Sequence, residues 1–195
     1  MDFSAFAAKA VRNIGIRTGK KLRRKGIIAT ELPKTMPTVI GGTKYVCGYA
    51  VREVMPKDLK AKKYWIAGHG MGKTLDRVHD PITVSAMWYG TDENAGIIHI
   101  SADIIGLTNF EVNIVRDSLK DFCAKSNCKG ITISCTHTHG GFDTVGYWGQ
   151  LYRLQTGKDK EYMDLLLRSL KEVAEEAYAN RKEGKLFVGT VHVPD

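Results

Sequence analysis

The chain has 195 residues, 43% of them hydrophobic and 26% charged, and a formal net charge of +8. This is the length of one ordinary domain, and it suffices to bury a core that needs no disulfide bonds or metal ions for stability. No stretch approaches the roughly 20 apolar residues that cross a bilayer, and no signal-peptide core stands at the start. We therefore expect a cytoplasmic protein. The four cysteines lack CxxC spacing and are expected to be reduced thiols.

Most of the positive charge lies in residues 1–25, where a basic cluster follows apolar residues at helical spacing, among them Phe3, Phe6 and Ile14. This pattern indicates an amphipathic helix and a basic linker. Such a helix can pack on its own domain, or it can make peripheral contact with an anionic membrane, and both interpretations stay open. Because the remaining chain is near neutral, nucleic-acid binding is not expected. Residues 1–42 are thus separated from an α/β domain over residues 43–195.

Strand and helix patterns alternate after the linker. In chain order we predict a strand over 45–54, a strand over 64–67, a helix over 81–89, a strand over 97–102, a helix over 110–122, a strand over 131–135, a helix over 163–177 and a strand over 186–193. The helix over 81–89 rests on Asp80 as N-cap and Pro81 at the first helical position. The helix over 163–177 is expected to end near Gly184 with cations in its last turn.

This order of elements favours an α/β fold with a largely parallel or mixed sheet and crossover helices. Ligands of such folds gather at the carboxyl ends of the strands. Two predicted strand ends carry polar residues, with Asp103 after one and the run Thr136–Gly141 after the other.

The pair His137 and His139 is the main chemical feature of this run. On extended backbone, residues two apart point the same way, so both imidazoles could reach one metal ion. The glycines that follow leave space for a substrate. Alternatively, the two loop histidines make ordinary hydrogen bonds and have no metal-binding or catalytic role. Asp103 could orient a histidine or substrate, or cap a helix.

The glycine-rich run Ala67–Thr74 fits a loose phosphate-loop pattern. A phosphate loop requires a helix to begin at about Gly72, so that its amides face the phosphates. Pro81 follows too soon for such a helix. A structural or active-site loop is therefore favoured over nucleotide binding. Structural roles are likewise favoured for the loop residues His69 and His79, and for His99 and His192 inside strands.

An ordered series of motifs from about residue 45 onward resembles the amino-terminal part of the neutral/alkaline, non-lysosomal ceramidase family. The motifs are Gly48–Pro56, Ile66–Gly68, Val78–Ile82, Ile100–Leu107 and Thr136–His139. The resemblance implies a zinc-dependent amidase that cleaves the N-acyl bond of ceramide or a related lipid amide.

The resemblance also implies roles for individual residues. His137 corresponds to a Zn²⁺ ligand, and His139 to a nearby catalytic histidine that helps to polarise or protonate the substrate. The family's remaining ligands, a histidine, a glutamate and a tyrosine, come from later sequence, so the domain is expected to be truncated at its C-terminal end. Gly140, Gly141 and Phe142 depart from the serine, glycine and proline usual after the family's histidines. The alternative from another class is a non-catalytic domain that binds a membrane surface or a partner.

Overall fold

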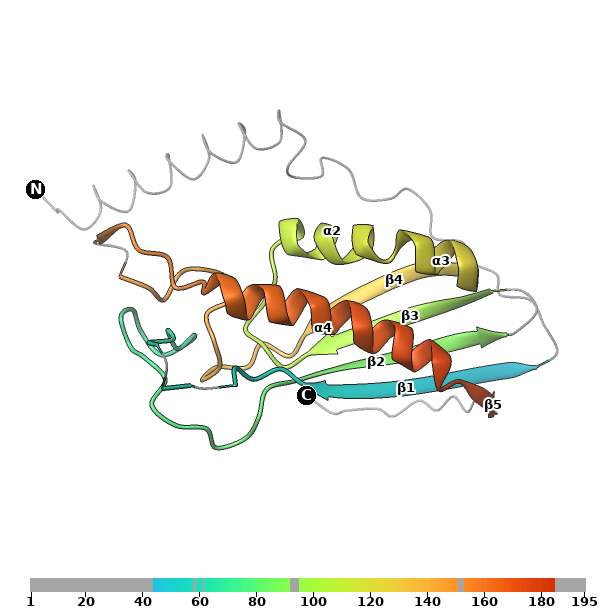
Figure 1. The fold of residues 1–195 in the computed structure, drawn as a ribbon, viewed down its shortest axis with the longest axis horizontal. Coiled ribbons are helices and arrows are strands. Elements are labelled where there is room, and N and C mark those ends of the chain that lie inside the picture. The colour runs from blue at the N-terminus through green and yellow to red at the C-terminus, as the bar shows by residue number, and fades with distance from the viewer. Residues whose placement is uncertain (1–43, 58, 61, 92–94, 151–152, 185–195) are drawn as a thin grey trace, which may run out of the picture. The chain divides into compact units, whose positions relative to one another are not determined.

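A computed structural model describes residues 44–57, 59–60, 62–91, 95–150 and 153–184. Its strands and helices are β1 (Tyr45–Glu53), β2 (Thr83–Thr91), β3 (Ala95–Ala102), α2 (Asn109–Ser118), α3 (Lys120–Ser126), β4 (Cys128–Cys135), α4 (Lys160–Ala179) and β5 (Lys182–Gly184). The strands form one sheet in the order β4-β3-β2-β1-β5 (Figure 1). The predicted basic helix, the predicted strand over 186–193 and His192 lie outside the described residues.

The sheet is mixed, and the fold is α/β as the sequence predicts. β2 pairs antiparallel with both β1 and β3, and β5 pairs antiparallel with β1. β4 is parallel to β3, and the intervening helices α2 and α3 form the crossover between them. The expected parallel arrangement therefore holds for this pair, whose carboxyl ends meet at one edge of the sheet.

The predicted helix over 81–89 is wrong, because this segment becomes strand β2. Val84, Ala86 and Trp88 alternate with partly exposed residues and are buried against the core. This period of two is that of a strand with one buried face, and it outweighs the helix-start signal of Asp80 and Pro81. The predicted strand over 64–67 is reduced to isolated bridges at Trp65 and Ile66.

The other predicted elements are present with shifted ends. The strands over 45–54, 97–102 and 131–135 are confirmed as β1, β3 and β4. The helix over 110–122 is divided at Leu119, which is fully buried and has φ −100° and ψ 4°. Helix α4 ends at Ala179 and has no basic residue in its last turn, so the expected cationic end near Gly184 is wrong. Gly184 instead pairs with Tyr45 at the edge of the sheet.

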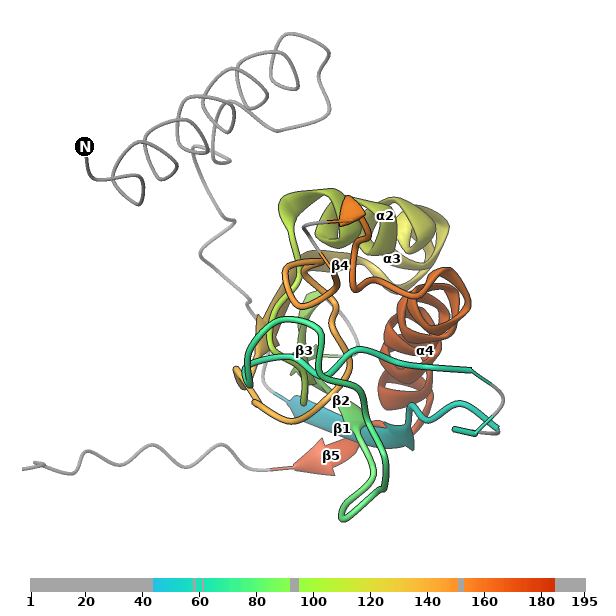
Figure 2. The same cartoon turned by 90° about the vertical axis from the view of Figure 1, so that its left-hand side faces the viewer.

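The core lies between one face of the sheet and the helices. Figures 1 and 2 show α2, α3 and α4 on the same face, with α4 running across β1 and β2. Trp88 from β2 packs edge to face on Tyr178 from α4, with ring centroids 4.7 Å apart. Phe142, from the loop after β4, stacks on Tyr162 at 3.9 Å. This contact ties the loop after β4 to the core.

None of the helices in the described ranges combines the length and the apolar character needed to cross a bilayer.

The four cysteines are free thiols in this fold. Burial and the neighbouring Cys128 raise the pKa of the Cys123 thiol to about 12. Burial also raises the pKa of Cys135. Both thiols therefore stay protonated and poorly nucleophilic at neutral pH.

A buried ion pair fixes the start of α2. Glu111 is 6% exposed, and its carboxylate lies 2.5 Å from the ammonium of Lys158. It also accepts hydrogen bonds from the backbone N–H of Thr108, at 2.9 Å, and from the Thr108 hydroxyl. Burial raises the pKa of Glu111, but the hydrogen bonds from Lys158 and Thr108 outweigh burial and lower this pKa below its usual value.

Replacing Glu111 with glutamine is expected to cost about 2 kcal/mol of stability at neutral pH, because it leaves Lys158 without its charged partner. Since the folded pKa is lowered, the contribution is present above the unfolded pKa of about 4.3 and is lost as pH falls through the folded pKa. Urea unfolding of both proteins between pH 7 and pH 3 should show the difference shrinking with pH. Asp164→Asn, which removes an exposed pair with Lys160, should have little effect at any pH. A pH-independent difference for Glu111→Gln would contradict this assignment.

Candidate active site

The candidate site is built from two loops that pair with each other through backbone hydrogen bonds. Residues 64–75 form a hairpin, with Ile66 N–H bonded to Lys73 O at 3.0 Å and Leu75 N–H to Tyr64 O at 2.9 Å. The segment after β4 pairs with this hairpin, since Ala67 N–H donates to Gly141 O at 2.9 Å and Gly140 N–H donates to Ala67 O at 3.0 Å. The loop that carries the histidines is therefore held by backbone hydrogen bonds.

This hairpin geometry differs from that of a phosphate loop. Thr74 forms a bridge with Trp65, and no helix follows Lys73 before strand β2 begins at Thr83 within the residues described there. The glycine-rich run thus lacks the helix N-terminus that cradles phosphates.

His137 is held with one ring nitrogen directed at the protein backbone. Its Nδ1 lies 2.7 Å from the carbonyl oxygen of Ile105. Because a carbonyl only accepts hydrogen bonds, Nδ1 is the donor, and in the neutral ring Nε2 keeps its lone pair. Metal-binding histidines are commonly fixed in this way, with the second nitrogen donating to a carbonyl.

The backbone at His137 is not extended as the sequence interpretation assumed. Its φ is 61°, in the left-handed region, so the spacing of two does not by itself align the two side chains. The chain reversal nevertheless brings the rings of His137 and His139 to 5.1 Å between centroids. Both side chains are exposed to solvent. The two histidines are thus adjacent, but for a different reason from the one expected.

His69 joins this pair from the tip of the hairpin. Its ring centroid lies 6.2 Å from that of His139. Sequence reasoning had given His69 only a structural loop role, and the glycines on both sides of it were the available sign of a tight hairpin. Among the described residues, no three His, Cys, Asp or Glu side chains are arranged to hold a metal ion. His137 and His139 could supply part of a ligand set.

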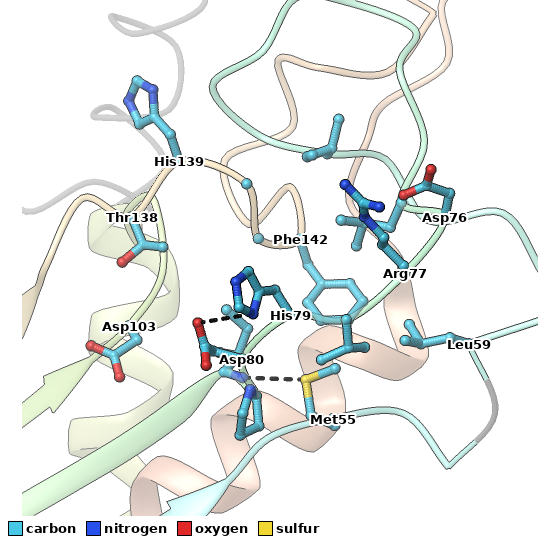
Figure 3. Close-up of a pocket in the computed structure, with 17 residues that line it drawn as sticks. Met55, Leu59, Asp76, Arg77, His79, Asp80, Asp103, Thr138, His139 and Phe142 are labelled. Atoms are coloured by element: carbon cyan, nitrogen blue, oxygen red, sulfur yellow. Dashed lines mark hydrogen bonds and ion pairs between the residues drawn. The ribbon is translucent and has the colours of Figure 1, made fainter.

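A cavity of about 550 Å³ opens beside His139. Figure 3 shows Asp103, Thr138 and His139 on the left side of it, with the apolar residues Met55, Leu59 and Phe142 to their right. His79 and Asp80 also line the cavity, 3.7 Å apart and almost fully exposed. His137 is not part of the lining.

Asp103 lies where the sequence predicts, at the carboxyl end of β3. Its carboxylate accepts a hydrogen bond from the Thr83 hydroxyl, and its N–H donates to Thr83 O at 2.9 Å. It does not cap a helix, because the N-cap of α2 is Thr108. Asp103 is therefore a cavity-lining carboxylate anchored to β2.

Sequence reasoning missed Asp143, which organises the loop after the histidines. This carboxylate is 2% exposed and accepts the backbone N–H groups of Val145, Gly146 and Trp148 at 3.0, 2.5 and 2.8 Å. An aspartate with a glycine three residues later, as in a type I turn, was the available signal. Asp143 thus has a structural role next to the site.

No family model and no curated protein matches this sequence. A search of solved structures finds the crystal structure of neutral ceramidase from Pseudomonas aeruginosa, with a TM-score of 0.59 and 14% sequence identity. The match covers 74% of this chain and 23% of the ceramidase chain, so this chain spans less than a quarter of the length of that ceramidase. At this identity the likeness concerns the fold alone. The described α/β fold is therefore similar to one part of a neutral ceramidase.

Proposed function

We propose that this chain carries part of a zinc-dependent amide-hydrolase site, related to that of the ceramidase family, with ceramide or another lipid amide as substrate. The observation that carries the proposal is the hydrogen bond from His137 Nδ1 to Ile105 O. In the neutral ring it leaves the Nε2 lone pair of His137 available to a metal ion, next to His139, which lines the cavity. The fold similarity to neutral ceramidase supports the same assignment.

In this proposal His137 binds zinc, and the ligand set is completed by groups other than the described residues. When bound, zinc lowers the pKa of its water ligand and polarises the amide carbonyl. His139 lies next to His137 and lines the cavity, so its ring is placed to give a proton to the leaving amine. That proton is needed because an amide anion is a very poor leaving group.

Asp103 has a supporting role in this proposal. Its carboxylate lines the same cavity as His139 and is held by Thr83. A fixed negative charge there favours the positive charge that develops on the amine as it is protonated. Asp103 therefore orients and stabilises the amine side of the substrate.

The first test is the zinc content of the purified full chain. We expect bound zinc in the wild-type protein and the loss of most of it in His137→Ala, because that variant removes a direct ligand. His99→Ala is the matched control, since His99 is bonded to Ser134 on the sheet and should not affect zinc. Elemental analysis after dialysis measures the content. Equal zinc in His137→Ala and the wild type would exclude His137 as a ligand, and zinc in neither would exclude a zinc site that this chain holds by itself.

A further inference from the structure

The cavity beside His139 has an apolar floor and charged ends. Its apolar residues include Met55, Leu59, Ile82 and Phe142. A volume of about 550 Å³ is within the range of small-molecule sites. The floor is therefore suited to one apolar chain of moderate size.

Charged side chains lie at both ends of the cavity. Asp103 lies with Thr138 and His139 at one end, and Arg77 lies with Asp76 at the other (Figure 3). In this view the side chains of Phe142 and Met55 lie between the two ends, together with the exposed pair His79 and Asp80. Apolar side chains and this polar pair thus separate the proposed reacting groups from a guanidinium.

Arg77 is exposed, and within the described part of the chain its guanidinium has no hydrogen-bond or ion-pair partner. Asp76 is its neighbour in the cavity wall, yet Figure 3 draws no ion pair between them. A guanidinium presents a planar set of donors that matches carboxylate or phosphate oxygens. Arg77 is therefore available to an anion entering the cavity.

A second cavity of about 670 Å³ adjoins the first and adds positive charge on the same side. It shares Leu59, Leu75, Asp76, Arg77 and Val78 with the first cavity, and it adds Lys60, Lys62 and Lys63. Lys62 is paired with Asp159 and Glu161, at 2.8 and 2.5 Å. Because these two carboxylates offset the charge of Lys62, the positive potential that attracts anions to this end comes from Arg77 and the exposed Lys63.

We propose that the substrate is an amide with an anionic group, a carboxylate or a phosphate, separated from the amide by an apolar chain and bound by Arg77. The amide position rests on the proposed function, whereas binding of the anion requires neither zinc nor hydrolysis. The amide lies toward His139, the apolar chain lies on Phe142 and Met55, and the anionic group reaches Arg77. Arg77 is thus a specificity-determining residue.

The test compares two amides that differ at one end. The monobutylamide of suberic acid has a carboxylate at the end of its acyl chain, and N-butyloctanamide has a methyl group there. Isothermal titration with the full chain, freed of metal by a chelator, measures binding without turnover. We expect the wild type to bind the carboxylate at least about tenfold more tightly, as a charge-assisted hydrogen bond allows.

Arg77→Gln should remove this preference while leaving binding of the neutral amide unchanged. Arg168→Gln is the matched control, because it removes the same charge from an exposed position on α4 and should keep the preference. Equal binding of the two amides by the wild type, equal effects of the two substitutions, or no binding of either amide would overturn the proposal. The zinc measurement reports on the catalytic assignment separately, so the two failures are distinguishable. The same amide with a phosphonate in place of its terminal carboxylate, tested in parallel, shows whether Arg77 prefers a phosphate or a carboxylate group.

Discussion

Gly68→Ala is expected to displace His139 and to abolish any function that depends on it. A Cβ added at Gly68 would lie 2.3 Å from Cγ of the His139 ring, far inside contact distance. The ring or the hairpin must therefore move. Gly68 also has φ 84°, a conformation that an alanine adopts only with strain.

Gly70→Ala is the control that separates these two effects. Gly70 has φ 92° in the same hairpin, and an added Cβ there meets nothing within 4 Å. Backbone strain alone should cost Gly70→Ala about 1 kcal/mol, and the clash should cost Gly68→Ala roughly 1–3 kcal/mol more. Thermal unfolding and the His139 ring resonances in NMR spectra measure both consequences. Equal unfolding temperatures and an unmoved His139 resonance in the two variants would show that the ring does not pack on Gly68.

Asp143→Ala is expected to destabilise the protein by about 3 kcal/mol, because it leaves three partly buried backbone N–H groups without their acceptor. The Asp143 carboxylate is closely packed, since a Cβ added at Gly157 would lie 1.9 Å from its Oδ2. Loss of Asp143 should also loosen Phe142, which packs on Tyr162 and lines the cavity.

Chemical denaturation of Asp143→Ala beside Asp117→Ala measures this effect. Asp117 forms an exposed pair with Lys120, so its removal should change stability by less than about 1 kcal/mol. Similar denaturation midpoints for the two variants would mean that water replaces the carboxylate and that the loop does not depend on it.

The candidate site was only partly predictable. The strand-end rule correctly placed Asp103 and the histidine run at neighbouring strand ends, because β3 and β4 are parallel. The spacing argument for His137 and His139 did not apply, because His137 adopts a positive φ. The proximity of His69 to His139 depends on hydrogen bonds between segments about 70 residues apart in the chain, and no local pattern reports such pairing.

The sequence sufficed to predict the α/β class, three of the core strands, the long amphipathic helix α4 and the position of the histidine run after β4. These follow from local periodicity, which records which face of an element is buried. Tertiary structure alone decided that residues 83–91 pair as strand β2 between β1 and β3, and that Ile105 O selects the tautomer of His137. Both depend on partners distant in the chain, and the free energy of those contacts outweighs local propensity.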